Sequence, residues 1–381
     1  MSLILTLNAG SSSLKFSVYQ DDAVLCTGQV ERLFGEAALL LDENGLRSTK
    51  PLGPVDHAGA LAAVIEALEP VLTGRKVSGV GHRIVHGGPD RRDPAELTEE
   101  TIEELRAYAP FAPLHQPHNL ACVVAARRLF PDAVQIGCFD TAFHRSHPWV
   151  NDTFALPRAL YDEGVRRYGF HGLSYDYVTA HLARTEPELA KSRVVICHLG
   201  NGASLCAVRD GQSVGSTMGF SALDGMPMGT RCGQVDPGVL LYLMVQKGMS
   251  PREIEDLLYR ESGLKGLSGI SGDMRTLLES DAPEAAEAIE YYVFRLSREI
   301  GAMAAVLGGI DGLVFTGGIG QNAAPIRARA CTRLGFLGIR LDEGANLSGL
   351  TDIGAGEVRV LRLATDEESV IAGAVRARLE A

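Results

Sequence analysis

Two stretches of the chain combine an apolar strand with a glycine-containing polar turn, and turns of this kind can bind phosphate. Residues 194–208 contain an apolar run, the turn Gly200-Asn201-Gly202 and a second apolar run. Residues 3–19 repeat the layout, with Asn8 in the place of Asn201. Each turn would offer backbone N–H groups to an anion. For one stretch alone, a purely structural Asn-Gly hairpin is an equal alternative. The repetition favours a duplicated fold with both turns at one ligand.

Four isolated polar residues have types that suit phosphoryl transfer. Arg83 lies near the end of an apolar run, Asp140 directly follows another, His171 opens a helical pattern, and Arg231 lies in the long loop 216–237. Catalysis of phosphoryl transfer depends on positioning and on charge that stabilises the transferring oxygens. Arg83 is either a paired structural ion or an anion clamp.

Glycines cluster at the ends of predicted strands, where a backbone can approach a nucleotide closely. The sequence has no Gly-x-x-x-x-Gly-Lys-Ser/Thr motif and no Gly-x-Ser-x-Gly motif. These observations predict an ATP phosphotransferase that uses Mg²⁺, but not a P-loop protein. The clusters are Gly79-x-Gly81, Gly87-Gly88, Gly200-x-Gly202, 263–272 and Gly317-Gly318-Ile319-Gly320.

The composition is that of a globular α/β protein with two domains. The chain has 381 residues, of which 46% are hydrophobic and 22% charged. A length above 300 residues usually exceeds one core. A net charge of −11 argues against nucleic acid as a partner. The seven scattered cysteines indicate reduced thiols and a cytoplasmic location. We expect no signal peptide and no membrane-spanning segment.

Hydrophobic periodicity predicts two abutting α/β domains with no low-complexity linker. We expect the first domain to contain 1–145 plus 369–381, so that the last helix returns to it, and the second to contain 146–368. Strands are predicted at both hairpins and at 77–85, 133–139, 311–316 and 358–363. Helices are predicted at 56–72, 97–108, 120–129, 237–246, 251–259, 271–278 and 283–307.

The chain resembles the acetate kinase family. The resemblance runs from residue 8 to 368, and each motif is several residues long. The motifs are Asn8-Ala-Gly-Ser-Ser-Ser-Leu-Lys15, His82-Arg-Ile-Val-His-Gly-Gly88, Phe139-Asp-Thr-Ala-Phe-His144, Tyr168-Gly-Phe-His-Gly172, His198-Leu-Gly-Asn-Gly-Ala-Ser204, Met228-Gly-Thr-Arg231 and Phe315-Thr-Gly-Gly-Ile-Gly320.

The resemblance implies duplicated ribonuclease-H-like domains of the actin-like ATPase superfamily, facing each other across a cleft. It also implies reversible, Mg²⁺-dependent (or Mn²⁺-dependent) phosphoryl transfer from ATP to acetate, giving acetyl phosphate and ADP in a cytoplasmic homodimer. The alternatives are a kinase for propionate or another short carboxylate and, more remotely, a sugar or polyol kinase. A non-catalytic nucleotide sensor would be expected to lose the arginines.

The same resemblance implies a role for each site residue. The catalytic residues would be Asp140, His171 and Arg231, and the metal would be held by Asn8 and Glu367. Acetate would contact Arg83, Val85, Leu114, Phe170 and Ala222. The nucleotide would contact Ser11, Ser13, Lys15, His115, His198, Leu199, Gly200, Asn201, Gly202, Asp273, Met274, Arg275, Gly317, Gly318, Ile319, Gly320 and Gln321.

Several positions depart from the family's usual pattern. The family commonly has Glu in place of Gln321, Pro in place of Ala222, His in place of Tyr175, Asp in place of Gln234, and Asn-Pro-Pro-Asn in place of Gln116-Pro-His118-Asn119. These changes affect substrate choice and nucleotide contacts rather than the reaction. A carboxylate acceptor is already ionised at about pH 7 and needs no general base. We therefore expect Asp140 to orient a neighbour or the metal.

Overall fold

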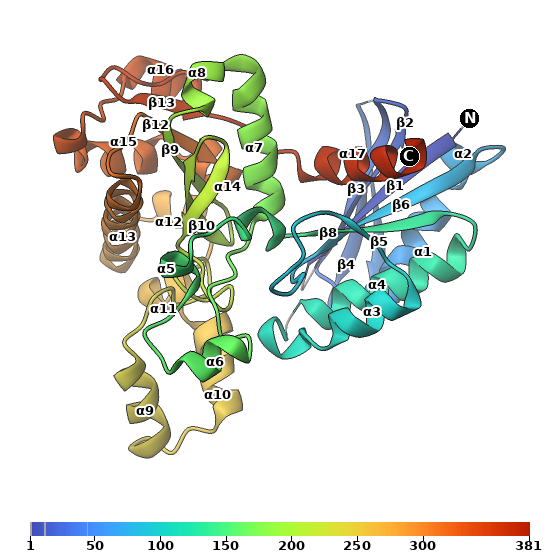
Figure 1. Ribbon diagram of the computed structural model, residues 1–381, viewed down its shortest axis with the longest axis horizontal. Coiled ribbons are helices and arrows are strands. Elements are labelled where there is room, and N and C mark those ends of the chain that lie inside the picture. Colours follow the sequence, from blue (N-terminus) through green and yellow to red (C-terminus); the bar gives the residue numbers. More distant parts are fainter. Residues whose placement is uncertain (1, 11–12, 44, 114) are drawn as a thin grey trace. The chain divides into compact units, whose positions relative to one another are not determined.

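The computed structural model describes residues 2–10, 13–43, 45–113 and 115–381. The chain forms two compact units, each with its own sheet (Figure 1). Unit 1 contains Met1–Arg145 and Asp366–Ala381, and unit 2 contains Ser146–Thr365. The sequence analysis put 366–368 in the second domain. They belong with unit 1 because Asp366 caps the last helix of the chain, whose second turn packs in that unit.

Unit 1 is built on a mixed sheet with the strand order β5-β4-β3-β2-β1-β6-β8-β7. Strand β1 pairs with β2 in an antiparallel hairpin and with β6 in parallel, and β6 pairs with β8 in parallel. The strands are β1 (Ser2–Ala9), β2 (Ser13–Gln20), β3 (Ala23–Glu31), β4 (Ala37–Glu43), β5 (Leu46–Gly53), β6 (Lys76–Ile84), β7 (Ala95–Glu96) and β8 (Val134–Phe139). The helices are α1 (His57–Ala67), α2 (Glu69–Leu72), α3 (Glu99–Arg106), η1 (Ala109–Phe111), α4 (Gln116–Leu129), η2 (Ala142–His144) and α17 (Glu367–Glu380).

Two helix layers cover the sheet of unit 1. Helices α1 and α4 pack on one face, where Leu5 and Val64 belong to the same core. Helix α17 packs on β1, β6 and β8 (Figure 1). Glycine is required beneath it, because a Cβ at Gly81 would lie 2.3 Å from Ile371 Cγ2. The predicted helix 56–72 forms two helices, α1 and α2, with Leu68 between them. Pro70 prevents a continuous helix because it has no N–H to donate to the preceding turn.

Unit 2 repeats the central strand pattern of unit 1 in its sheet, whose order is β11-β10-β9-β12-β13. Strands β9 and β10 form the second hairpin, and β12 pairs in parallel with both β9 and β13. The order β3-β2-β1-β6-β8 thus matches β11-β10-β9-β12-β13 in strand directions, as a duplicated fold requires. The strands are β9 (Arg193–Leu199), β10 (Ala203–Arg209), β11 (Gln212–Ser216), β12 (Gly312–Thr316) and β13 (Arg359–Arg362).

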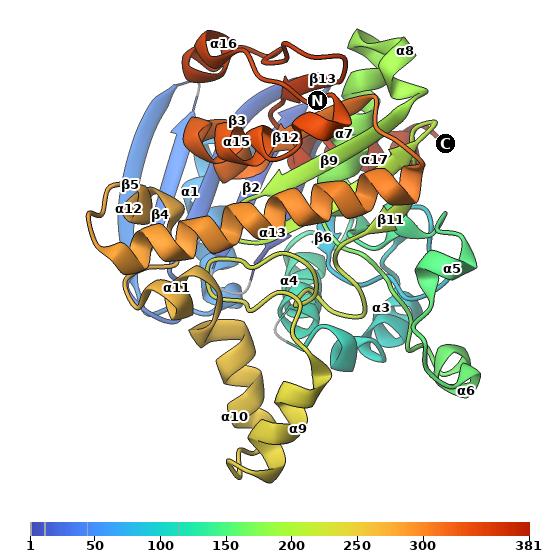
Figure 2. The ribbon, with the colours of Figure 1, turned by 90° about the vertical axis from the view of Figure 1, so that its left-hand side faces the viewer.

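The longest helix of unit 2 lies across its sheet (Figure 2). This helix, α13, buries Tyr292, Leu296 and Ile300, and its predicted span is confirmed. Helices α9 and α10 project from the rest of the unit (Figures 1 and 2). The helices are α5 (Trp149–Asp152), α6 (Arg158–Asp162), α7 (Gly172–Thr185), α8 (Pro187–Ala190), α9 (Pro237–Val245), α10 (Pro251–Asp256), η3 (Leu257–Glu261), α11 (Gly263–Ser268), α12 (Met274–Leu278), α13 (Pro283–Leu307), α14 (Gly317–Asn322), α15 (Ala324–Thr332), η4 (Gly335–Leu337) and α16 (Glu343–Ser348).

Candidate active site

The end of β1 places Asn8 among charged groups within unit 1. The Asn8 side chain is buried, and its Oδ1 accepts a hydrogen bond from Nη1 of Arg83 at 3.1 Å. Its Nδ2 donates to Glu367 Oε2 at 3.3 Å and to Glu368 Oε1 at 3.4 Å. These contacts bring together the ends of β1 and β6 and the first turn of α17. The predicted metal residues Asn8 and Glu367 are therefore neighbours.

Arg83 and Asp140 form a close ion pair beside Asn8. Arg83 Nη2 donates to Asp140 Oδ2 at 2.6 Å, and Arg83 Nε lies 3.0 Å from Oδ1. Asp140 is only 1% exposed. Burial opposes the charge of Arg83, but Asp140 and Glu367 outweigh that effect and raise the pKa of the guanidinium. The structure thus shows Arg83 as a paired ion, and its remaining nitrogen, Nη1, donates to Asn8.

The oxygen atoms near Asn8 suit a hard divalent cation. Burial and the neighbouring carboxylate of Glu367 raise the pKa of Glu368, because the two negative charges repel each other. A cation there would relieve this repulsion. Mg²⁺ is commonly held by one or two carboxylates and completed by water and substrate phosphates. Among the described residues, no group of three or more His, Cys, Asp or Glu side chains is placed to hold a metal by itself.

The N-terminal turn of α4 holds the ends of two strands, and the sequence analysis did not identify this role. Asn119 Nδ2 donates to the Ala9 carbonyl at 2.7 Å, and Asn119 Oδ1 accepts from the Val85 N–H at 2.9 Å. Gln116 accepts from the N–H of His86 and donates to its carbonyl. The polar sequence 115–119 next to a predicted helix was the available signal, since buried amides of this kind satisfy backbone groups at strand ends.

The remaining predicted residues of unit 1 lie around these strand ends. The Lys15 side chain is exposed, and its charge lowers the pKa of Glu368 in part. Ser13 begins β2, and its carbonyl accepts from the N–H of Gly10 at 2.8 Å. Val85 is buried, and His115 immediately precedes α4. Ser11 and Leu114 lie outside the described residues.

The second hairpin turn is held by backbone contacts within unit 2. Gly200 N–H donates to the Gly202 carbonyl at 3.0 Å, and Gly229 N–H donates to the Asn201 carbonyl at 3.2 Å. A Cβ at Gly229 would lie 2.9 Å from the backbone carbonyl oxygen of Gly272, besides 2.4 Å from Asn201 Oδ1, so glycine lets the loop approach this closely. The turn therefore packs against the loop that contains Arg231.

His171 and Arg231 border the same glycine of this turn. A Cβ built on Gly202 would lie 3.1 Å from His171 Nε2 and 3.8 Å from Arg231 Nη1. His171 has a left-handed backbone with φ of 58°, a conformation that is uncommon outside glycine and often occurs at functional sites. Its ring stacks on His198 with centroids 4.3 Å apart. The structure thus brings together three predicted residues and the tip of the hairpin.

Arg231 is oriented by its own loop. Its Nη1 donates to the carbonyl of Ala222 at 3.1 Å. Ala222 therefore contributes a backbone contact to Arg231, besides the predicted contact of its side chain with substrate. Phe170, the other predicted apolar contact in unit 2, is buried next to His171.

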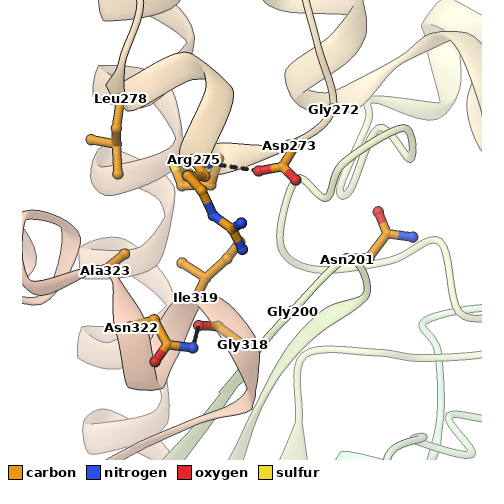
Figure 3. Close-up of a pocket in the computed structure, with 11 residues that line it drawn as sticks. Gly200, Asn201, Gly272, Asp273, Arg275, Leu278, Gly318, Ile319, Asn322 and Ala323 are labelled. Carbon is orange, nitrogen blue, oxygen red and sulfur yellow. Dashed lines mark hydrogen bonds between the residues drawn. The ribbon is translucent and has the colours of Figure 1, made fainter. Parts of the chain in front are cut away.

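A cavity of about 380 Å³ lies next to the second hairpin turn (Figure 3). Its size falls within the range of small-molecule sites. Asp273 caps α12 by accepting from the Arg275 N–H at 2.7 Å, which turns this segment toward α14. The predicted residues that line the cavity are Gly200, Asn201, Asp273, Met274, Arg275, Gly318 and Ile319. Gly272, from the glycine cluster 263–272 noted in the sequence, also lines the cavity, and the predicted nucleotide contacts did not include the lining residues Leu278, Asn322 and Ala323.

Other predicted nucleotide residues support this cavity without lining it. Gly317 and Gly320 are buried in α14, and Leu199 is buried at the end of β9. The Gln321 carbonyl accepts a hydrogen bond from Arg327, which is itself 1% exposed. Arg327 also donates to the Gly320 carbonyl at 2.8 Å. The Arg327 guanidinium therefore holds the C-terminal end of α14, where the last carbonyl groups of a helix have no partner within the helix.

Comparison with known proteins identifies the class of this protein and then its family. The chain is 48% identical to an acetate kinase of Methylocella silvestris, over 97% of this chain and 96% of that one. The structure of a propionate kinase from Francisella tularensis superposes with a TM-score of 0.92 at 33% identity, covering 98% and 99% of the two chains. An acetate kinase structure from Porphyromonas gingivalis gives 0.89 at 36% identity and covers both chains fully.

The protein is a kinase with a duplicated α/β fold. The family profile described as "Acetokinase family" matches residues 3–373, and the chain belongs to that family. None of the helices in the described part of the chain is long and apolar enough to span a bilayer.

Proposed function

We propose that this kinase transfers the γ-phosphoryl group of ATP reversibly to acetate. One P–O bond to ADP breaks as another forms to the acetate oxygen, which gives acetyl phosphate. The observation that carries the proposal is the placement of His171 Nε2 and Arg231 Nη1 around Gly202, next to a cavity of nucleotide size. Two nitrogen donors at a glycine-rich turn suit a group whose negative charge is spread over three oxygens.

In this proposal, Arg231 and His171 stabilise the transferring phosphoryl group. The Ala222 carbonyl fixes the Arg231 guanidinium before substrate arrives. Such preorganised donors act mainly on the transition state, because negative charge is redistributed there. The cavity between α12 and α14 receives the adenosine, and Asn201 lies where the cavity meets the hairpin turn.

In unit 1, Arg83 binds the carboxylate of the acceptor, and Asp140 orients Arg83. A carboxylate that accepts three hydrogen bonds from a guanidinium is a weak base. Acetate is already ionised and needs no base, whereas a sugar hydroxyl does. The close Arg83–Asp140 pair therefore favours a carboxylate acceptor over a sugar or polyol.

Asn8 and Glu367 hold Mg²⁺ or Mn²⁺ in this proposal, and Glu368 contributes negative charge. A cation held there would supply positive charge to offset the negative charge of the phosphates. Asn8 orients the glutamates through its Nδ2 and receives the Arg83 guanidinium on its Oδ1. The side chain thus links the cation-binding carboxylates to the acceptor-binding arginine.

We further propose that the enzyme is a cytoplasmic homodimer. Helix α9 has no buried residue in the isolated chain, and Leu241 and Val245 are 60% and 73% exposed. Apolar surface of this extent usually marks a protein interface. Sedimentation equilibrium tests the proposed dimer. We expect the wild type to sediment as a dimer and the Leu241→Glu/Val245→Glu variant to sediment as a monomer. The cytoplasmic location is supported by the free cysteines.

The deciding experiment is to incubate the protein with ATP, Mg²⁺ and acetate in the presence of hydroxylamine. An acyl phosphate is trapped as a hydroxamate, whereas a sugar phosphate is not. Parallel reactions contain propionate, glucose or no acceptor, and a further one replaces Mg²⁺ with EDTA. Hydroxamate from acetate only with the cation present is expected. ADP formation from glucose without hydroxamate from acetate would overturn the proposal.

A further inference from the structure

Three buried or partly buried groups form a continuous hydrogen-bonded row behind the Gly202 turn. Tyr175, in the first turn of α7, is 0% exposed, and its hydroxyl lies 2.5 Å from Ser204 Oγ on β10. Ser204 Oγ in turn lies 2.8 Å from Nδ1 of His171. The family commonly has histidine at the position of Tyr175, so a tyrosine hydroxyl at this end of the row is a departure of this chain from the family pattern.

The row reaches the face of His171 opposite to the proposed phosphoryl site. Nδ1 faces Ser204, while Nε2 faces Gly202 and the Arg231 guanidinium. A neutral imidazole carries its proton on one nitrogen only, and its partner on the other nitrogen decides which. Ser204 has one hydroxyl proton, and if Tyr175 donates to its Oγ, that proton is left to be donated to Nδ1. The buried Tyr175 can do so, since burial raises its pKa well above the usual value and it keeps its proton.

We propose that Tyr175 is a positioning residue that acts through Ser204 to hold neutral His171 with its proton on Nε2. The tyrosine hydroxyl donates to Ser204 Oγ, and Ser204 donates to His171 Nδ1. His171 then presents an N–H, rather than a lone pair, to the space beside Gly202. This inference rests on the proposed function, in which that space receives the transferring phosphoryl group.

The opposite direction of hydrogen-bond donation, from His171 Nδ1 to Ser204 and on to Tyr175, would oppose the proposed reaction. A proton on Nδ1 would leave the Nε2 lone pair facing anionic phosphate oxygens. A doubly protonated ring would place a second positive charge beside Arg231 when no phosphate is bound, and like charges disfavour that state. The neutral ring with an Nε2 proton avoids both costs and is preorganised for donation.

Nitrogen-15 NMR of histidine-labelled, ligand-free protein at neutral pH tests the inference directly. The His171 signals are assigned by their loss in His171→Gln. We expect the wild type to show the Nε2–H tautomer and Tyr175→Phe to show a larger Nδ1–H fraction. Tyr177→Phe, the same substitution on the same helix, is the matched control and should leave the tautomer unchanged. An Nδ1–H or doubly protonated ring in the wild type, or no change in Tyr175→Phe, overturns the inference.

Steady-state kinetics supply a second readout. We expect Tyr175→Phe to lower kcat about 10-fold with little change in KM for ATP or acetate, because the interaction acts in the transition state. Ser204→Ala should lower kcat at least as much, and Tyr175→Phe/Ser204→Ala should be no worse than Ser204→Ala alone. Additive effects of the two substitutions would contradict a common path. The NMR experiment needs no activity, so it distinguishes failure of this inference from failure of the proposed function.

Discussion

The two hairpins share one backbone design but have opposite charge around their tips. Each has two antiparallel strands, an asparagine near the turn and a parallel third strand. In unit 1, Asn8 near the end of β1 contacts Glu367, Glu368 and Arg83, and Arg83 is paired with Asp140. The tip in unit 2 is bordered by the nitrogen atoms of His171 and Arg231. The first environment favours a cation, and the second favours an anion.

This difference arises outside the hairpins themselves. The side chains of neighbouring elements set the charge beside each hairpin and so decide whether it suits a cation or an anion. In unit 1 these side chains come from β6, from the residue after β8 and from α17. In unit 2 they come from the residue before α7 and from the loop 216–237. Substitutions of these side chains therefore test the comparison.

The largest effect is expected from Arg83→Ala, which leaves the buried Asp140 without its guanidinium. Breaking a buried ion pair by removing one partner costs about 3–5 kcal/mol of unfolding free energy. We also expect the KM for acetate to rise more than kcat falls. Urea unfolding and steady-state kinetics measure the two effects. Arg83→Ala/Asp140→Asn is the control and should recover part of the stability. Equal stability of Arg83→Ala and the wild type would contradict the unit 1 half of the comparison.

Arg231→Ala should act on catalysis with a smaller effect on stability. Loss of one preorganised donor costs about 3 kcal/mol in the transition state, so kcat should fall by roughly 10²-fold, while the KM for acetate changes little. Arg231→Lys keeps the charge and should recover only part of kcat, because lysine lacks the planar fork of arginine. The opposite pattern, with KM changed and kcat kept, would contradict a role for Arg231 in stabilising the anion at the Gly202 turn.

Acid should destabilise unit 1 through His82 of β6. Its ring Nε2–H donates a hydrogen bond to the amide oxygen Oε1 of Gln135 in β8. Burial lowers the pKa of His82 to about 4. The unfolded state then binds the extra proton first, so stability is lost as pH falls from about 6.5 toward 4. The loss is about 2 kcal/mol by about pH 5. Urea midpoints from about pH 7 to 5 should show a shallower slope in His82→Gln. Equal slopes would contradict it.

The smallest effect is expected from Ala222→Pro. We expect the wild type to prefer acetate but to accept propionate, because alanine leaves more room than the proline that the family commonly has. One methylene in an apolar pocket is worth about 1–3 kcal/mol, and a partly opened wall changes only part of that. The ratio of kcat/KM for acetate and propionate should rise in Ala222→Pro. An unchanged ratio would show that this part of the loop does not contact the methyl group.

The sequence predicted the strand pattern and the residue types of the site, but not their partners. Both hairpins, the strand before Asp140 and the helix 283–307 follow from hydrophobic periodicity, which is a local property. The pairing of Arg83 with Asp140 joins residues from different strands, so no local pattern encodes it. For the same reason, the polar residues 115–119 were a signal for buried amides but could not specify that Asn119 holds both Ala9 and Val85.

The lining of the cavity beside the second hairpin turn also could not be predicted from sequence motifs alone. The glycine pattern 317–320 correctly indicated a turn from strand to helix, yet Gly317 and Gly320 are buried and only Gly318 of the three glycines lines the cavity. Helical geometry turns successive residues away from one face, so a motif cannot specify which members reach the ligand. Leu278 and Ala323 line the cavity without belonging to any motif.

The return of α17 to unit 1 also affects how the protein is made. Unit 1 begins the chain, but the helix that covers its β1 and β6 is synthesised only after all of unit 2. Until then Gly79 and Gly81 leave part of the sheet without the side chains of Ile371 and Val375. Unit 1 is therefore discontinuous in the chain, and its core cannot be completed before the residues of unit 2 have been synthesised. A chain that stalls before residue 366 would present an exposed sheet to chaperones.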